Sequence, residues 1–165
     1  TDRSRGLGDV YKRQVYRNLS EDEKRQICAW KYDGEYDLYN LPSYEEMQVR
    51  QIGFMNPQRE KNYYGFWDES ILVGFVNILE EKEEVFIGIG VNPDLCNKHY
   101  GQRMLLITYE ISKKLYPDKP LYLEVRTWNI RAVKCYQKAG FRIDGQAYEL
   151  TTGIGTGTFY RMIRE

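Results

Sequence analysis

Apolar and polar positions follow the period of a strand in some segments of the chain and the period of a helix in others. Residues 63–67, 71–79 and 85–91 are rich in aromatic and β-branched side chains and are separated by short polar turns, which predicts an antiparallel three-stranded meander. Beyond Pro93 the apolar residues recur at helical spacing, which predicts an amphipathic helix that ends before Pro117. Its apolar positions are Met104, Ile107, Ile111 and Leu115.

Two capping boxes mark helix starts in the first third of the chain. Ser20 is followed three residues later by Glu23, and Ser43 by Glu46. A serine hydroxyl at this spacing accepts a hydrogen bond from the amide three residues on, which begins a helix. The expected elements are a strand at 15–19 and helices at 20–32 and 43–51.

The last third of the chain alternates again between strand and helix. We expect a strand at 120–126, a helix at 129–139 with Gly140 at its C-terminal cap, and two final strands at 141–150 and 158–164. The stretch from 85 to 126 is therefore strand, helix, strand. Such a unit makes its two strands parallel through a right-handed crossover, so the sequence predicts a mixed sheet with helices packed on it.

Composition narrows the class of protein. The chain has 165 residues, 42% of them hydrophobic, which suits one globular domain over residues 15–165. Its 24 Lys and Arg residues balance 24 Asp and Glu residues, so we expect neither a nucleic acid nor an anionic membrane as partner. The longest apolar run is too short to cross a bilayer. Residues 1–14 carry no apolar periodicity and are interpreted as a non-native or disordered leader.

Cysteine and histidine usage argues against several kinds of site. Cys28, Cys96 and Cys135 are odd in number and unrelated in spacing, which favours small buried or half-buried thiols in a reducing, cytoplasmic compartment. His99 is the single histidine of the sequence. A histidine-based metal site and a serine triad are therefore not expected, and we predict no metal.

The loop "NPDLCNKHYGQR" stands between the strand that ends at Val91 and the long helix. A helix N-terminus leaves about four backbone N–H groups unpaired and can bind an anion. Lys98 and Arg103 flank these amides, and Gly101 would let a phosphate approach the backbone. An ordinary strand-to-helix turn with two solvated cations is the alternative on these residues alone.

The same loop resembles the acyl-CoA loop of the GNAT superfamily of N-acetyltransferases, whose pattern is (Q/R)xxGx(G/A). Gly101 matches that pattern, whereas Cys96 stands where the family prefers Gln or Arg and His99 where it prefers Gly. The resemblance implies that backbone amides from about Asn97 to Gln102 wrap the diphosphate of the coenzyme.

The strand "LYLEVR" carries a carboxylate where apolar residues are usual. Alternation places Tyr122, Glu124 and Arg126 on the face opposite to the three aliphatic residues. A strand of a parallel pair is normally apolar on both faces. Glu124 therefore has either a chemical role or a place on the surface, as a pair with Arg126 or on a face open to water.

"LEVRTWNIRAVKCYQKAGF" resembles the second GNAT motif, particularly the form seen in ribosomal-protein alanine N-acetyltransferases. The resemblance implies that Asn129 and Ala132 lie along the coenzyme arm, that the Tyr136 phenol points at the thioester sulfur, and that Glu124 is the base. An ordinary core position, with its hydroxyl at the rim, is the alternative for Tyr136. The implied fold is α/β, a mixed sheet of about seven mostly antiparallel strands, with one parallel pair splayed for acyl-CoA and about four helices.

These roles suit the reaction that the resemblance implies. An alkylammonium group holds its proton to a pH near 10, so a base must remove it before the amine attacks a thioester. A backbone N–H near Val91 would stabilise the oxyanion, and the Tyr136 phenol would protonate the departing thiolate. The predicted catalytic residues are Tyr136 and Glu124, and the predicted acetyl-CoA site is Ile89, Val91, Cys96, Asn97, Lys98, His99, Tyr100, Gly101, Gln102, Asn129, Ala132 and Tyr136.

The acceptor is expected to bind near residues 32–49, which hold five carboxylates and no lysine or arginine. An acidic, aromatic mouth would favour a cationic amine, and Tyr32, Tyr36 and Tyr39 are the predicted acceptor-binding residues. Solvated carboxylates at a helix N-terminus are the equal alternative. A protein N-terminus, a lysine, a polyamine, an amino acid and an aminoglycoside all remain open as acceptors.

The sequence therefore predicts an acetyl-CoA-dependent N-acetyltransferase that acts on a small-molecule or peptide amine as a monomer or homodimer. The alternative is a non-catalytic acyl-CoA-binding or sensing domain. A dinucleotide-binding domain is disfavoured, because neither "GIGVNP" nor "GIGTG" has the full glycine spacing or the strand-turn-helix setting.

Overall fold

The computed structural model describes residues 14–165, so all but the last residue of the predicted leader lies outside the described residues. The described chain folds into two compact units. The first contains the residues up to Asn77 together with Ile89–Tyr100, and the second contains Ile78–Gly88 and Gly101–Glu165. The strands β3 (Ile71–Glu80) and β4 (Val85–Val91) contribute residues to both units.

The first unit begins with strand β1 and continues through two helices to strand β2. Its capping boxes form as expected: the Ser20 hydroxyl accepts from the Glu23 amide at 3.3 Å, and the Ser43 hydroxyl accepts from the Glu46 amide at 3.1 Å. The elements are β1 (Gln14–Asn18), α2 (Glu21–Ala29), α3 (Tyr44–Arg50) and β2 (Tyr63–Asp68), with 3₁₀ turns η1 (Gly34–Tyr39), η2 (Gly53–Met55), η3 (Glu60–Asn62) and η4 (Pro93–Leu95).

A hydrophobic core joins α2, α3 and β2 within the first unit. Its buried members include Ile27, Met47 and Phe54. Lys24 is also buried, with 2% of its surface exposed, and its ammonium binds Glu21 at 3.1 Å and Glu60 at 2.8 Å. Burial by itself lowers the pKa of Lys24, but the two carboxylates outweigh it and the pKa is raised.

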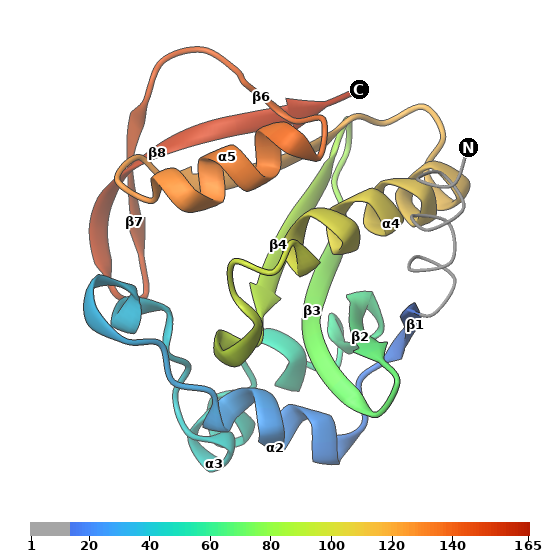
Figure 1. Ribbon diagram of the computed structural model, residues 1–165, viewed down its shortest axis with the longest axis vertical. Coiled ribbons are helices and arrows are strands. Elements are labelled where there is room, and N and C mark those ends of the chain that lie inside the picture. Colours follow the sequence, from blue (N-terminus) through green and yellow to red (C-terminus); the bar gives the residue numbers. More distant parts are fainter. Residues whose placement is uncertain (1–13) are drawn as a thin grey trace. The chain divides into compact units, whose positions relative to one another are not determined.

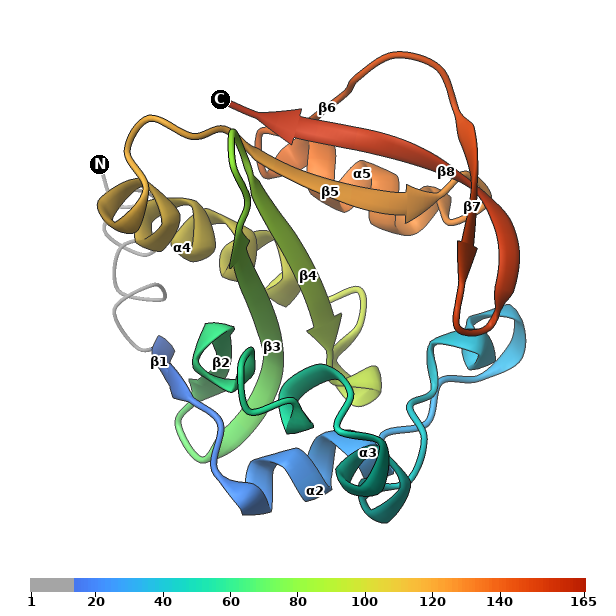
Figure 2. The ribbon, with the colours of Figure 1, turned by 180° about the vertical axis from the view of Figure 1, so that it is seen from behind.

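The second unit holds the remaining helices and strands. Helix α4 (Tyr100–Leu115) leads to β5 (Leu121–Arg126), and β5 leads to α5 (Ile130–Lys138). The chain ends in β6 (Arg142–Ile143), β7 (Tyr148–Thr152) and β8 (Gly155–Arg164). Figures 1 and 2, seen from opposite sides, show α5 against one face of β5 and β8.

The sheet is mixed. Its strand order is β1-β2-β3-β4-β5-β8-β6, and β7 pairs with β8. β4 and β5 form the predicted parallel pair, with Val85 opposite Leu121 and Phe86 opposite Tyr122. The eight strands and four α-helices of the described chain agree with the predicted fold class.

Two details of the predicted elements were wrong. Of the four predicted apolar positions of α4, Met104 and Ile111 are buried, but Ile107 is half-buried and Leu115 is 50% exposed, because Leu105, Thr108 and Ser112 complete the buried side. The Thr108 hydroxyl is satisfied within the helix, because it donates to the Met104 carbonyl at 2.7 Å. The strand expected at 141–150 is split into β6 and β7, with Gly145 at φ 76° between them.

Candidate active site

β5 shows the alternation that its sequence predicts. Leu121, Leu123 and Val125 are buried, with at most 4% exposed, whereas Tyr122 and Glu124 on the other face are half-buried. A half-buried carboxylate on a central strand needs a hydrogen-bond partner.

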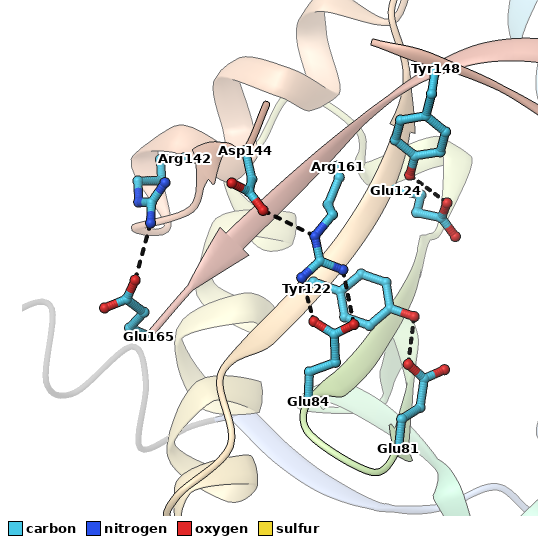
Figure 3. A network of polar contacts seen from close by, with 9 residues as sticks. All are labelled: Glu81, Glu84, Tyr122, Glu124, Arg142, Asp144, Tyr148, Arg161 and Glu165. Atoms are coloured by element: carbon cyan, nitrogen blue, oxygen red, sulfur yellow. Dashed lines mark hydrogen bonds and ion pairs between the residues drawn. The ribbon is translucent and has the colours of Figure 1, made fainter. Parts of the chain in front are cut away.

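The partner of Glu124 is Tyr148, the first residue of β7. Its hydroxyl donates to Glu124 Oε2 at 2.6 Å. Figure 3 shows the two side chains facing each other. The surface pair between Glu124 and Arg126, which was the alternative from sequence, does not describe this arrangement, because the Arg126 guanidinium lies over the Phe159 ring at 4.7 Å. Burial raises the pKa of Tyr148, and the bond to Glu124 raises it further.

Sequence reasoning missed Tyr148. A strand was expected over 141–150, but its sequence does not show which strand the side chain of Tyr148 would meet. The contact depends on the pairing of β7 with β8 and of β8 with β5, where Tyr148 is opposite Phe159 and Glu124 is opposite Arg161. The β7–β8 pairing is a hairpin between consecutive strands, whereas the β5–β8 pairing joins residues that are distant along the chain.

A second polar cluster lies on the same side of β5 and β8. Arg161 makes two hydrogen bonds to the Glu84 carboxylate and one to Asp144 at 3.2 Å. Its guanidinium also lies 4.3 Å from the centre of the Tyr122 ring, and the Tyr122 hydroxyl donates to Glu81 at 2.7 Å. Figure 3 shows these side chains beside the pair of Glu124 and Tyr148.

Helix α5 carries the second group of predicted residues. Asn129 is its N-cap, is 7% exposed, and accepts from the Ala132 amide at 3.2 Å through its side-chain oxygen. Tyr136 follows Ala132 by four residues, so the two share one face of the helix, and Tyr136 is half-buried. Gly140 ends the helix with φ 94°, a conformation that glycine adopts without strain.

The loop before α4 has an unusual backbone. η4 is capped by Asn92, whose side chain accepts from the Asp94 amide at 3.0 Å. Asn97 and His99 then adopt positive φ, at 64° and 66°, directly before α4 begins at Tyr100. Glycine, which the GNAT pattern prefers at the position predicted for His99, adopts this left-handed backbone without strain, whereas a residue with a Cβ adopts it at a cost of about 1–2 kcal/mol.

Side chains around this loop differ in exposure. Lys98 is exposed, whereas Cys96, Tyr100, Gly101 and Gln102 are half-buried. The Tyr100 hydroxyl donates to Asp68 at 2.6 Å, and the Gln102 amide donates to the Lys138 carbonyl at 3.5 Å.

The C-terminal end of β4 belongs to the first unit and makes two hydrogen bonds within it. The Val91 carbonyl accepts from the Tyr32 hydroxyl at 2.6 Å, and the Asn92 amide donates to the Val73 carbonyl at 2.8 Å. Ile89 and Val91 are half-buried. The structure thus brings together Tyr32 and Val91, which the sequence had assigned to acceptor binding and to coenzyme binding.

The other predicted acceptor residues lie on η1. Tyr36 and Tyr39 are half-buried, and Glu35 and Asp37 beside them are exposed. Tyr44, which belongs to the same tyrosine-rich stretch, is instead buried and donates to Glu21.

The three cysteines are buried or half-buried thiols, as the sequence predicts. Cys28 is buried, and Cys96 and Cys135 are half-buried. Burial raises the pKa of the Cys28 and Cys135 thiols, which makes both less nucleophilic.

Metal and membrane features are absent from the residues that the structure describes. Residues 14–165 contain no group of three His, Cys, Asp or Glu side chains arranged to hold a metal ion. No helix in this part of the chain has the length and apolar character needed to cross a bilayer.

Solved structures with the same fold include known acetyltransferases. A spermidine N-acetyltransferase from Vibrio cholerae in complex with CoA and spermine has 18% sequence identity and a TM-score of 0.71, over 92% of this chain and 95% of that one. A GNAT-family acetyltransferase from Bacillus anthracis has 18% identity and a TM-score of 0.75, over 92% and 93%. AAC(6′)-Ib in complex with ribostamycin and coenzyme A has 17% identity and a TM-score of 0.70, over 92% of each chain. These likenesses confirm the predicted fold.

The family follows from the sequence itself. No curated protein matches the chain. The model of the acetyltransferase (GNAT) family matches residues 6–141, which include the loop before α4 and the whole of β5 and α5. The finer resemblance to ribosomal-protein alanine N-acetyltransferases remains a prediction. Because the match covers most of its length, the chain belongs to the GNAT acetyltransferase family.

Proposed function

We propose that this protein transfers the acetyl group of acetyl-CoA directly to a primary amine of a small molecule or a protein. The observation that carries the proposal is the family match over residues 6–141. The half-buried Glu124 on β5 supports it, because a carboxylate held by a phenol can act as the base that the reaction requires.

In this reaction Glu124 takes a proton from the ammonium form of the acceptor, directly or through water. The neutral amine then attacks the thioester carbonyl, and a backbone N–H near Val91 stabilises the oxyanion. When the carbon–sulfur bond breaks, Tyr136 donates its phenolic proton to the departing thiolate, and its phenolate then takes the second proton, which the attacking nitrogen loses as the amide forms. The products are an acetylated amine and CoA.

Residues in both sequence motifs fit acetyl-CoA as a co-substrate. The backbone from Asn97 to Gln102 enters the N-terminus of α4, a helix of 16 residues that can bind a diphosphate. Asn129 and Ala132 at the start of α5 would contact the pantetheine arm. Ile89 and Val91 would contact it from β4.

A cationic acceptor is favoured by the charges of the first unit. All five carboxylates of residues 32–49 are exposed, on Asp33, Glu35, Asp37, Glu45 and Glu46. Tyr32, Tyr36 and Tyr39 add aromatic surface to this segment. Two of the structural relatives bind ligands that are also cationic amines: the polyamine spermine and the aminoglycoside ribostamycin.

We also propose a compartment, a class of partner and an oligomeric state for the protein. The cysteine content supports a reducing, cytoplasmic compartment. The balanced charge argues against nucleic acid, and a monomer or homodimer is the expected state.

The test is release of CoA thiol from acetyl-CoA against a panel of amines. The panel contains spermidine, spermine, ribostamycin, free amino acids, and peptides with either a free N-terminus or an internal lysine. Acceptor-dependent release in the wild type, lost in Glu124→Gln, supports the proposal. Tight binding of CoA by calorimetry without release for any amine supports the non-catalytic alternative instead.

A further inference from the structure

Two tyrosines of the second unit donate hydrogen bonds to carboxylates on the same side of the sheet. Tyr122 donates to Glu81 at 2.7 Å, and Tyr148 donates to Glu124 Oε2 at 2.6 Å. Figure 3 shows both pairs in one view. Only the second pair contains the proposed base, so the two pairs offer a natural comparison.

We propose that Tyr148 is a positioning residue for the general base. Its hydroxyl holds Oε2 of Glu124 and favours the charged carboxylate, so that Oε1 is the atom that takes the proton of the acceptor amine. This inference rests on the proposed function and adds a residue that neither sequence motif contains.

The length and direction of the bond support this role. A distance of 2.6 Å is typical of a hydroxyl that donates to an ionised carboxylate. The pKa of Tyr148 is raised by burial and then by Glu124, so the phenol stays neutral and remains the donor. A phenol that donates to a carboxylate stabilises its charged form.

The other charged groups that face Glu124 are engaged elsewhere. Arg161, opposite Glu124 on β8, binds Glu84 and Asp144. On β5 itself, Arg126 lies over Phe159, and Tyr122 donates to Glu81. Tyr148 is therefore the group in the described chain to which the structure assigns a direct hydrogen bond with Glu124.

Loss of the Tyr148 hydroxyl has a definite effect on the pH profile. Without the donor, the charged form of the carboxylate loses a stabilising hydrogen bond at Oε2. The acid limb of kcat/KM should therefore move to higher pH. At a pH below that limb, kcat/KM should fall several-fold, with a smaller change on the plateau.

The experiment compares Tyr148→Phe with the matched control Tyr122→Phe. Each change removes one phenol that donates to a carboxylate, but only the first touches Glu124. An upward shift of the acid limb in Tyr148→Phe, with the wild-type profile in Tyr122→Phe, supports the inference. Equal shifts in both variants, or an unshifted profile in Tyr148→Phe, would overturn it.

A spectroscopic readout separates this inference from the proposed function. If the wild type releases no thiol for any amine, the proposed function fails, but the pairing can still be measured by ¹³C NMR of the glutamate carboxyl groups. The carboxyl titration that disappears in Glu124→Gln should move to higher pH in Tyr148→Phe. An unmoved titration would contradict the inference.

A second variant covers the case in which Tyr148→Phe does not fold. In Glu124→Gln the anionic partner of Tyr148 is gone, so the ring of Tyr148 should titrate at lower pH than in the wild type. An unchanged Tyr148 titration would also overturn the inference.

Discussion

The loop before α4 and the polar face of β5 are expected to serve the same reaction, but they are built differently. The loop from Asn92 to Arg103 departs from the family pattern at Cys96 and His99, and its expected contribution is made by backbone amides. On β5 and α5, by contrast, the expected contribution is made by the side chains of Glu124 and Tyr136. A backbone amide is still present after a side chain is substituted, whereas the carboxylate of Glu124 or the phenol of Tyr136 is lost.

The expected difference fits the sequence, which departs from the loop pattern at Cys96 and His99 but matches the pattern NxRAxxxYxxxGF of the second motif. It also ranks the effects of mutation: changes on β5 and α5 should act on turnover, and changes in the loop should act mildly on coenzyme affinity.

The largest effect is expected for Glu124→Gln. The amide cannot accept the proton of the acceptor amine, so kcat/KM should fall by at least about 100-fold. The acid limb of the pH profile should disappear with it, and acetyl-CoA binding should be unchanged by calorimetry. Wild-type turnover across the pH range would show that Glu124 is not the base.

Tyr136→Phe should lower kcat by roughly 10–100-fold, because the departing thiolate loses its proton donor. The dissociation constant of acetyl-CoA should change little, since the ring remains. Single-turnover measurements of thiol release would detect the loss directly. A variant with unchanged kcat would return Tyr136 to the role of an ordinary packed tyrosine.

Asn129→Ala tests whether an N-cap also serves the coenzyme. Loss of the bond to the Ala132 amide should cost about 1 kcal/mol of the free energy of unfolding. Ser43→Ala is the matched control, because it removes a comparable cap of α3. Both should lower the melting temperature, but only Asn129→Ala should weaken acetyl-CoA binding. Equal affinities in the two variants would leave Asn129 with a structural role alone.

The smallest effect is expected for His99→Gly. Glycine adopts φ 66° without strain and lets a diphosphate approach the amides, so acetyl-CoA should bind a few-fold more tightly. Asn97→Gly is the control, because Asn97 also has positive φ but stands where the family pattern has no glycine. Weaker or equal binding in His99→Gly would count against the alignment of this loop.

Most of the fold could be predicted from sequence because its signals are local. Each capping box begins a helix one residue after its serine, and alternation in β5 correctly separates buried Leu123 from half-buried Glu124. The helix α4 was placed correctly, and Met104 and Ile111 of its predicted apolar positions are buried, whereas Leu115 is exposed. Thr108 and Ser112 are fully buried on α4. The spacing of apolar residues cannot predict that polar residues are buried.

The site was predictable where a motif lies within one stretch of chain. Glu124 and Tyr136 are twelve residues apart and share one motif. Tyr148 and Tyr32 are different, because each meets its partner only through contacts between distant segments: Tyr148 with Glu124 and Tyr32 with the Val91 carbonyl. Sequence proposed a role for Tyr32 but did not identify this partner.

Lys24 is protected from the chemistry that the protein is proposed to perform. An acyl thioester modifies only a lysine that is both deprotonated and accessible, and Lys24 is neither: it is 2% exposed and two carboxylates raise its pKa. We therefore expect the ion cluster with Glu21 and Glu60 to remain intact in a pool of acetyl-CoA. Self-acetylation would fall on exposed lysines such as Lys98 and would leave Lys24 unmodified.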